Sequence, residues 1–256
     1  MATSLGIGGQ IVTDGLVLCL DALNPLSYEG SGIYWNDLSG QDNHATLIGS
    51  NSEVHTYYGK YFTSDPLGYY GASSSGTSGQ TTSGSYWDIL YDTSLSPTST
   101  GQWTVSGFMN VNGEQTGNGV GWFHKQGTGD ERGIHIEPIS NSIRVNGASG
   151  WSNPSISISS YFNQWKMYTV TYKTTGTYGV DTGTLNVYID DTLVTTNSSF
   201  RPAADTTSNI WLGRRNGHHR HYLKGSTANY LYYLRELTIG EIREIYRTFR
   251  ARYNQL

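Results

Sequence analysis

The 256-residue sequence predicts an all-β protein, a sandwich of two antiparallel sheets with a short C-terminal helix. Three observations support this fold class. Aromatic residues make up 13% of the chain, charged residues only 14%, and glycines number 32, as is typical of turn-rich β proteins. Short apolar or alternating segments recur between Gly, Pro, Asn and Asp residues. Helical periodicity is confined to the segment after residue 238.

The chain is organised around its first apolar strand. Leu16 to Leu20 form a short apolar run that ends at Asp21, a pattern typical of a strand buried on both faces. The sequence Asp-Leu-Ser-Gly at 37–40 predicts a tight turn in which Asp37 accepts backbone hydrogen bonds. The N-terminal residues 1–13 are glycine-rich and are expected to form an arm or an edge strand, and we expect the folded domain to span residues 14–256.

Further strands are expected where apolar and polar residues alternate or where aromatic residues cluster between turn residues. They are expected at residues 33–35, 44–48, 57–62, 86–90, 103–109, 122–125, 134–136, 143–145, 165–172, 183–194, 210–213 and 230–235. Residues 71–85 are a low-complexity Gly/Ser/Thr stretch, which we interpret as a flexible loop inserted in the domain.

The C-terminal helix is predicted by its start signal and its periodicity. Thr238 and Glu241 have the spacing of a capping box, which satisfies the first backbone N–H groups of a helix. Apolar residues then recur at helical spacing, so we expect this face to dock on the sandwich. These residues are Ile239, Ile242, Ile245, Tyr246 and Phe249.

Several motifs together resemble one family. The stretch 15–48 contains Leu-Asp-Ala, Asn-Pro, Trp-x-Asp-Leu-Ser-Gly and Asn-His-Ala-Thr-Leu, and the chain later contains Leu-Thr-x-x-Glu-Ile. This series is similar to the laminin-G-like, concanavalin-A-like jelly-roll modules of virion proteins of tailed bacteriophages, cyanophages among them. The resemblance covers roughly residues 14–250 and implies a concanavalin-A-like jelly roll. Gly107-Phe108 departs from the family pattern, which has a second aromatic residue near this position.

The resemblance implies a non-catalytic virion protein, assembled in the bacterial cytoplasm and displayed on the capsid or on a tail or fibre. Its partners would be capsid or tail proteins, or copies of itself. The alternative is a lectin that binds host surface polysaccharide. A glycoside hydrolase ranks third, because it needs two carboxylates flanking the scissile bond. We interpret Asp130, Glu131 and Glu137 as solvated turn charges, and we expect no cofactor.

Aromatic and histidine residues in loop sequence are the candidates for ligand binding. Five tryptophans, Trp35, Trp87, Trp103, Trp165 and Trp211, have strand patterns and are expected in the core. The others lie next to Gly, Asn or Pro, where an exposed ring can stack on a sugar or a cation. The candidates for a ligand rim are Trp122, Trp151, Tyr161, His218 and His219.

The run His-His-Arg-His at 218–221 has three interpretations. His219 and His221 could share a metal from one side of a strand, since alternate residues share a face. No acidic residue lies nearby in sequence to complete such a site, so we expect no metal there. A loop that contacts a glycan or a partner and a plain loop are the other two. Calcium is an option in laminin-G modules, but no dense string of oxygen ligands supports it here.

The two ends of the chain carry opposite charge. Residues 1–92 hold nine acidic side chains and one basic one, whereas residues 214–256 hold nine basic and three acidic ones. The ends either neutralise each other within one fold or form a contact between molecules. Nucleic-acid binding is not expected, because the net charge is −4 and no phosphate-binding motif accompanies the basic end.

Three arginines on the polar side of the helix, Arg243, Arg247 and Arg250, are the candidates for an assembly contact. Arg243 and Arg247 are a like-charge pair at i,i+4, which favours acidic partners from elsewhere. Acidic turns containing Asp37, Asp42 and Asp88 are the expected partners. Cys19 lies in an apolar strand and is expected to act as a small buried hydrophobe. No membrane insertion is expected, because no apolar run approaches the ~18 residues that a membrane helix needs.

Overall fold

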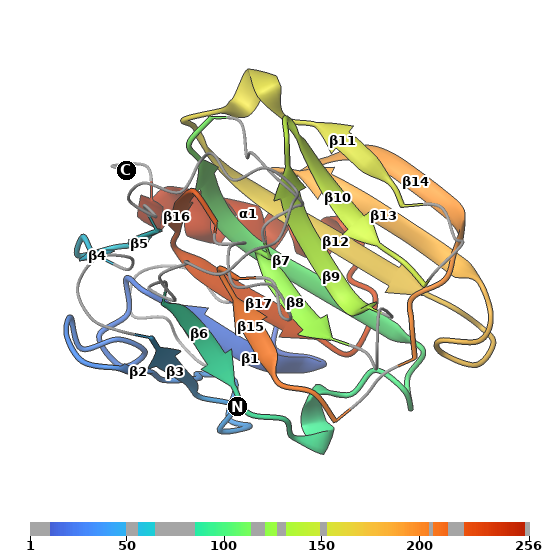
Figure 1. Cartoon of the computed structure of the whole chain (residues 1–256), viewed down its shortest axis with the longest axis horizontal. Coiled ribbons are helices and arrows are strands. Elements are labelled where there is room, and N and C mark those ends of the chain that lie inside the picture. Colours follow the sequence, from blue (N-terminus) through green and yellow to red (C-terminus); the bar gives the residue numbers. More distant parts are fainter. Residues whose placement is uncertain are drawn as a thin grey trace, which may run out of the picture.

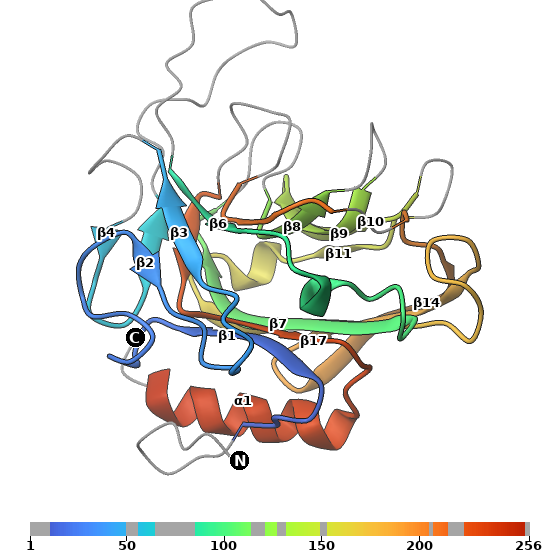
Figure 2. The same ribbon diagram turned by 90° about the horizontal axis from the view of Figure 1, so that it is seen from below.

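The computed structural model describes residues 11–49, 56–64, 85–113, 121–126, 132–148, 153–204, 207–214 and 223–253. In this part of the chain two antiparallel sheets pack face to face, and helix α1 (Ile239–Tyr253) lies against the outer face of one of them (Figures 1 and 2). The predicted fold class, an all-β jelly-roll sandwich with a C-terminal helix, is confirmed.

The sheet that carries α1 has nine strands in the order β14-β13-β12-β7-β16-β5-β4, and β17 joins β1 to β7. Every pairing is antiparallel, and β7 pairs with β12 over nine consecutive residue positions. The strands are β1 (Leu16–Asp21), β4 (Thr56–Tyr57), β5 (Phe62–Ser64), β7 (Gln102–Val111), β12 (Trp165–Lys173), β13 (Gly183–Ile189), β14 (Thr192–Phe200), β16 (Gly225–Thr227) and β17 (Asn229–Tyr233).

The second sheet has eight strands in the order β11-β10-β9-β8-β15-β6-β3-β2. They are β2 (Tyr34–Trp35), β3 (Ala45–Ile48), β6 (Tyr86–Ile89), β8 (Phe123–Gln126), β9 (Arg132–Ile139), β10 (Ser142–Asn146), β11 (Ser155–Ser157) and β15 (Ile210–Leu212). Two short 3-10 turns, η1 (Thr93–Leu95) and η2 (Ser159–Tyr161), complete the described elements.

The main core fills the space between the sheets. Trp35, Trp87 and Trp103 are each at most 1% exposed, which confirms the prediction that they are core residues. The Trp35 ring lies 4.7 Å from Phe62 and 5.3 Å from Trp87 between ring centroids. Trp165 and Trp211 are also predicted to be core residues, but the structure shows that they are only partly buried. Trp211 alternates with the buried Ile210 and Leu212, so it points away from the sandwich.

A second apolar cluster lies between the nine-stranded sheet and α1. Ile242, Ile245, Phe249 and Tyr253 from α1 are buried against strand residues such as Phe108. The capping box is formed, since Glu241 N–H donates to Thr238 Oγ1 at 3.3 Å and Thr238 N–H donates to Glu241 Oε2 at 2.8 Å. The predicted helix face is therefore confirmed, except that Ile239 is 38% exposed and does not dock.

Packing explains why the sequence departs from the family pattern at Gly107-Phe108. A Cβ atom at Gly107 would overlap the carbonyl oxygen of Asn229 and lie 3.1 Å from the Trp122 ring. The backbones of β7 and of the segment that begins β17 therefore approach more closely here than a side chain would permit. Phe108, the next residue, points to the other face of β7 and packs beneath α1, with its ring 5.7 Å from that of Tyr253.

The turn at 37–40 forms as predicted. Asp37 is 7% exposed and accepts the backbone N–H groups of Cys19 at 2.7 Å, Ser39 at 2.9 Å and Asn43 at 3.1 Å. Gly40 has φ +86°, the left-handed conformation that favours glycine. The turn therefore ties β1 to the segment that leads into β3.

Residues 57–62 do not form one extended piece, because β4 and β5 make a hairpin that turns through residues 58–61. Of the low-complexity stretch 71–85, only Ser85 lies within the described residues, and so do only residues 11–13 of the N-terminal arm. The predicted domain limits stay a prediction. No helix in the described part of the chain is long and apolar enough to cross a membrane.

Candidate binding groove

Two adjoining hollows lie where the C-terminal half of α1 meets the turn between β13 and β14. Their volumes are about 280 Å³ and about 170 Å³, and they share Lys166, Asp190, Tyr246 and Arg250 as lining residues. Tyr161 lines the larger hollow and Trp165 the smaller one. We call the surface made by these residues the helix groove: Tyr161, Trp165, Lys166, Asp190, Tyr246 and Arg250.

The acidic wall of the helix groove is fixed by a hairpin turn. Asp190 is the first residue of the two-residue turn between Ile189 and Thr192, and its φ is +57°, which Asp tolerates better than most residues. Its carboxylate accepts the Met167 N–H at 3.1 Å and pairs with the Lys166 ammonium at 2.9 Å. These two bonds hold the turn against β12, so the charged groups of the groove have defined positions.

The aromatic walls lie next to cations. The Lys166 ammonium is 5.2 Å from the centroid of the Tyr161 ring, and the Arg250 guanidinium is 5.5 Å from that of Tyr246. Both distances fall within the ~6 Å range of cation–π attraction. The Tyr246 phenol is protonated at neutral pH, as any tyrosine is, and can donate a hydrogen bond. Burial and nearby Asp190 raise its pKa further.

The aromatic surface continues beyond the groove. The Trp165 ring meets the Tyr61 ring edge-on at 5.1 Å, and Tyr61 stacks on Tyr58 at 5.4 Å. Tyr58 is 57% exposed, so the series ends at a ring that is open to solvent. Four rings from β12, the β4–β5 hairpin and η2 thus lie on or beside one surface.

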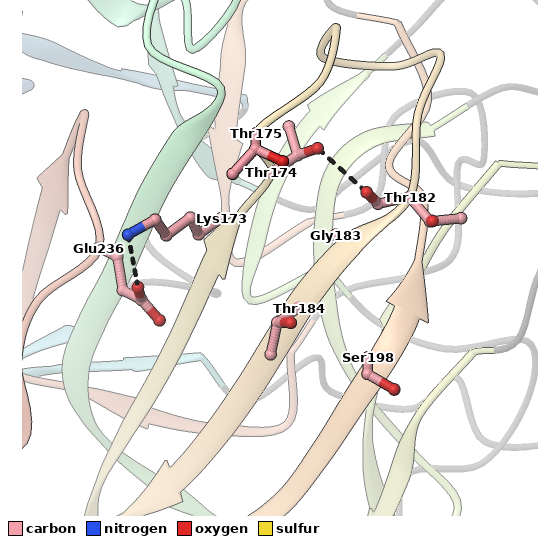
Figure 3. Close-up of a pocket in the computed structure, with 8 residues that line it drawn as sticks. All are labelled: Lys173, Thr174, Thr175, Thr182, Gly183, Thr184, Ser198 and Glu236. Carbon is pink, nitrogen blue, oxygen red and sulfur yellow. Dashed lines mark hydrogen bonds and ion pairs between the residues drawn. The ribbon is translucent and has the colours of Figure 1, made fainter.

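A separate hollow of about 470 Å³ opens on the outer face of β12, β13 and β14 (Figure 3). Most of its lining side chains carry hydroxyls, and Lys173 and Glu236 face each other at one side, 4.0 Å apart. Thr174 donates from its hydroxyl to the Thr182 carbonyl at 3.0 Å. No aromatic ring lines this hollow in the described structure, so it offers hydrogen bonds but no stacking surface.

One prediction about charge is wrong. Glu137, interpreted from the sequence as a solvated turn charge, is fully buried on β9. Its carboxylate pairs with His135 Nε2 at 2.9 Å and accepts from Arg144 Nε at 2.8 Å and Asn146 Nδ2 at 2.7 Å. Glu137 has these partners because of the register of the two strands: β9 and β10 pair Glu137 with Arg144 and His135 with Asn146. The alternation of residues 135 and 137 on one face was the signal that could have revealed this cluster.

The cluster around Glu137 has the character of a structural network. Burial alone would raise the pKa of Glu137, but hydrogen bonds and charges from His135, Asn146 and Arg144 outweigh it and hold the pKa well below its usual range. The His124 ring stacks on His135 at 4.1 Å. Within the described residues, no group of three or more His, Cys, Asp and Glu side chains is arranged to hold a metal ion.

The structure separates the predicted ligand-rim residues. Trp122 was expected on an exposed loop, and that expectation is wrong, because the residue is 0% exposed. Its ring lies in the core between the sheets, 5.6 Å from Tyr230. Tyr161 is the candidate that the structure places in the helix groove. Trp151, His218 and His219 lie outside the described residues.

The predicted assembly arginines have neighbours within the chain. Arg243 lies 3.9 Å from Asp191, the second residue of the β13–β14 turn, and Arg250 lines the helix groove. Arg247 is exposed on the same helix. Within one copy, two of the expected partners have other contacts, because Asp37 is engaged by its own turn and Asp88 accepts a hydrogen bond from Asn209. Asp42 lies 4.0 Å from His44.

The opposite charges of the two ends are partly neutralised inside the fold. Arg252 pairs with Asp21, and Arg235 lies 3.0 Å from Asp14. Both pairs join the acidic N-terminal region to the basic C-terminal segment. The first of the two interpretations, neutralisation within one fold, is therefore confirmed for these pairs.

No family model matches the chain, and no curated protein matches it in sequence. Solved structures do match in fold. The sialidase of Trypanosoma rangeli in complex with sialic acid superposes with a TM-score of 0.63 at 14% identity, over 96% of this chain and 35% of that one. The binding domain of Paraclostridial Mosquitocidal Protein 1 gives 0.60 at 16%, over 93% and 53%. The botulinum neurotoxin serotype D binding domain gives 0.60 at 15%, over 93% and 52%.

These similarities define the class of fold. The chain is a jelly-roll β-sandwich of the kind found in sialidase and toxin binding domains. It spans about a third of the length of the matched sialidase chains and about half of the toxin binding domains. At these levels of sequence identity the likeness concerns the fold alone.

Proposed function

We propose that the chain is a non-catalytic recognition domain that binds carbohydrate in the helix groove. The observation that carries this proposal is the combination of partly exposed rings with paired charges in one concave surface. Tyr161, Trp165 and Tyr246 are each partly exposed. Aromatic faces stack on the C–H faces of sugars, while Asp190 and Arg250 offer an acceptor and donors for sugar hydroxyls.

The groove is better suited to binding than to hydrolysis. A glycosidase places two carboxylates on opposite sides of the scissile bond, about 5 to 9.5 Å apart. Here the two carboxylates, Asp190 and Asp191, are neighbours in one turn, next to Lys166 and Arg243 respectively. Two neighbouring residues of one turn do not stand on opposite sides of a space that could hold a glycosidic bond. The placement of these carboxylates supports a binding domain over an enzyme.

The fold is consistent with recognition. Two of the similar structures are described as binding domains, and another is a sialidase in complex with sialic acid. The resemblance of the sequence to phage modules suggests where such a domain would act. On a bacteriophage particle, its ligand would be the surface polysaccharide of the host. A role as a capsid or tail component remains a prediction, which a density map of the intact particle would test.

The test compares two arginines on the same helix. Arg250→Ala removes a charged donor from the groove, whereas Arg247→Ala changes an exposed residue one turn away that lines neither hollow. Both variants and the wild type are titrated against a panel of neutral and acidic bacterial surface polysaccharides. We expect a loss of roughly tenfold in affinity for Arg250→Ala, equivalent to about 1.4 kcal/mol, and wild-type affinity for Arg247→Ala.

Tyr161→Ala provides an independent arm, since it removes a ring from the opposite wall of the groove. The melting temperature of Tyr161→Ala is measured as a control for folding. It should fall by no more than is expected when a half-buried side chain is truncated. Equal polysaccharide affinities for the wild type, Arg250→Ala and Tyr161→Ala would remove the groove as the binding site. No binding to any polysaccharide by the wild type would remove the function itself.

A further inference from the structure

We propose that the helix groove is one end of a longer site, which holds several sugar units of an acidic polysaccharide chain. The other end is the aromatic strip, the series of rings Trp165, Tyr61 and Tyr58. This inference rests on the proposed function and adds to it the length and the charge of the ligand. It is carried by the continuity of the groove with the strip and by the charge at the two ends of the site.

Trp165 joins the aromatic strip to the helix groove. Its side chain lines the smaller hollow, and its ring meets the Tyr61 ring at 5.1 Å between ring centroids. Tyr61, Trp165 and Tyr246 all pack against the apolar cluster beneath α1, so the strip and the groove lie on the same face of the nine-stranded sheet. An extended ligand can therefore pass from the groove to the strip along one surface of the molecule.

The hairpin that carries Tyr58 and Tyr61 is held by hydrogen bonds. Tyr58 N–H donates to the Tyr61 carbonyl at 3.0 Å, and Gly59 between them has φ +78°, a conformation that favours glycine. The Tyr57 hydroxyl lies 2.9 Å from the Gly59 carbonyl oxygen and 2.9 Å from that of Ala22, the residue that follows β1. The turn is thus ordered before any ligand binds, which lowers the entropy that binding on its rings would cost.

Tyr58 forms the open end of the aromatic strip. Its ring stacks on that of Tyr61 with an interplanar angle of 20°, and the residue is 57% exposed. The apolar surface of the ring that Tyr61 leaves uncovered is in contact with water, and burying it against the C–H face of a sugar is favourable. A sugar unit on Tyr58 would lie outside the helix groove, so a ligand that uses both must be a chain.

Each end of the site carries a cation. Arg250 is exposed and lines both hollows of the groove, and Lys60 is partly exposed in the turn between Tyr58 and Tyr61. In the part of the chain that the structure describes, neither cation pairs with an acidic side chain, whereas Lys166 pairs with Asp190 at 2.9 Å. The two uncompensated charges favour a chain that carries carboxylate groups over a neutral one.

The charge of the ligand is tested with one polysaccharide in two forms. The probe is the carboxylated polysaccharide of the panel that the wild type binds most tightly, compared with the same chain after its carboxylates have been reduced to alcohols. Reduction keeps the length and the stacking faces of the sugars and removes their charge. We expect the reduced chain to bind the wild type roughly tenfold more weakly, and the affinity for the native chain to fall as salt is added.

The length of the site is tested with fragments of the native chain, fractionated by size. A short fragment fits the groove alone, so Tyr58→Ala should bind it like the wild type. For the full-length chain, Tyr58→Ala should lose roughly fivefold in affinity, because one stacking face is gone. Lys60→Gln should lose roughly threefold for the native full-length chain and nothing for the reduced one.

Tyr34→Ala is the matched control for Tyr58→Ala. Tyr34 is 63% exposed on β2, next to the fully buried Trp35. Because successive side chains of a strand alternate, its ring points to the outer face of the eight-stranded sheet, on the side of the sandwich opposite α1. Tyr34→Ala should bind every fragment like the wild type. Melting temperatures report whether each variant folds.

Equal affinities of the wild type, Tyr58→Ala and Lys60→Gln for the native full-length chain would overturn the extended site. The groove itself would stand if Arg250→Ala and Tyr161→Ala still weaken binding. Equal affinities for the native and reduced chains, or binding to neutral polysaccharides alone, would overturn the acidic ligand. So would tighter binding of single-stranded RNA, which also combines negative charge with stacking faces. No binding to any polysaccharide would remove the proposed function and this inference together.

Discussion

The hydroxyl of Tyr253, in the last turn of α1, donates a 2.8 Å hydrogen bond to Asp21 Oδ1 at the end of β1, 232 positions earlier in the chain. Arg252 pairs with the other oxygen of the same carboxylate. Asp21 is fully buried, so these two residues satisfy a charge that has left water. The end of the helix is thereby fixed to the first strand.

The first prediction concerns this junction. Tyr253→Phe should lower the free energy of unfolding by about 1–2 kcal/mol, since a buried acceptor loses one donor. Arg252→Ala should cost more, about 3 kcal/mol or above, because it leaves the buried Asp21 carboxylate without its cation. Urea unfolding measures both. Arg247→Ala, an exposed residue on the same helix, is the control and should unfold like the wild type. Equal stability of all three variants would contradict a structural role for the junction.

The second prediction concerns the core. Trp35 is fully buried and touches Phe62, Trp87 and Tyr230 with its ring. Trp35→Ala should therefore cost about 3–5 kcal/mol, a large fraction of the stability of an ordinary domain. The matched control is Leu90→Ala, at a large apolar residue that is 72% exposed. A Trp35→Ala variant that melts at the wild-type temperature would show that the ring is not part of the core.

The third prediction compares two glycines. Gly107→Ala should destabilise the protein by at least about 1–3 kcal/mol, because the new methyl group overlaps the Asn229 carbonyl. Gly240→Ala should stabilise it by about 0.5–1 kcal/mol, because Gly240 lies in α1 with its nearest neighbour at 3.8 Å. Thermal melts of the two variants should shift in opposite directions. A Gly107→Ala variant that melts at or above the wild-type temperature would mean that the close approach at Gly107 is relaxed in solution.

Local chemistry explains which parts of the fold were predictable from the sequence. The turn at Asp37 and the capping box of Thr238 and Glu241 each involve residues a few positions apart, and both form as predicted. The strands were predictable for the same reason, because alternating side chains and the turn residues that bound a strand are local features of the sequence. Trp122 was misplaced because its burial depends on Gly107 and Tyr230, which are distant in sequence.

The candidate groove was less predictable than the fold. Tyr161 and Arg250 were singled out separately, one as a ligand contact and one as an assembly contact, and the structure places both on the same groove. What joins them is the β13–β14 turn at Asp190, whose position relative to α1 no local pattern encodes. The burial of Glu137 was missed for a similar reason, because it needs the register of β9 against β10.

The last prediction concerns acid stability. The pKa of Glu137 lies below its usual range, because His135, Asn146 and Arg144 together outweigh the effect of burial. Hydrogen bonding by Arg235, aided by Thr238, likewise lowers the pKa of Glu241 to about 2. A carboxylate whose folded-state pKa is depressed contributes its full stabilisation above the ordinary Glu pKa of about 4.3. That stabilisation is lost as the pH falls toward the folded-state value.

The free energy of unfolding should therefore be flat around neutral pH and fall below about pH 4.5. Glu137→Gln should reduce stability at pH 7 and flatten the acid limb of the curve, since its carboxylate no longer titrates. Glu241→Gln should flatten the limb more weakly, because its partly exposed pair is screened by solvent. Urea unfolding at a series of pH values measures these slopes. An acid limb as steep in Glu137→Gln as in the wild type would show that the buried cluster does not govern acid unfolding.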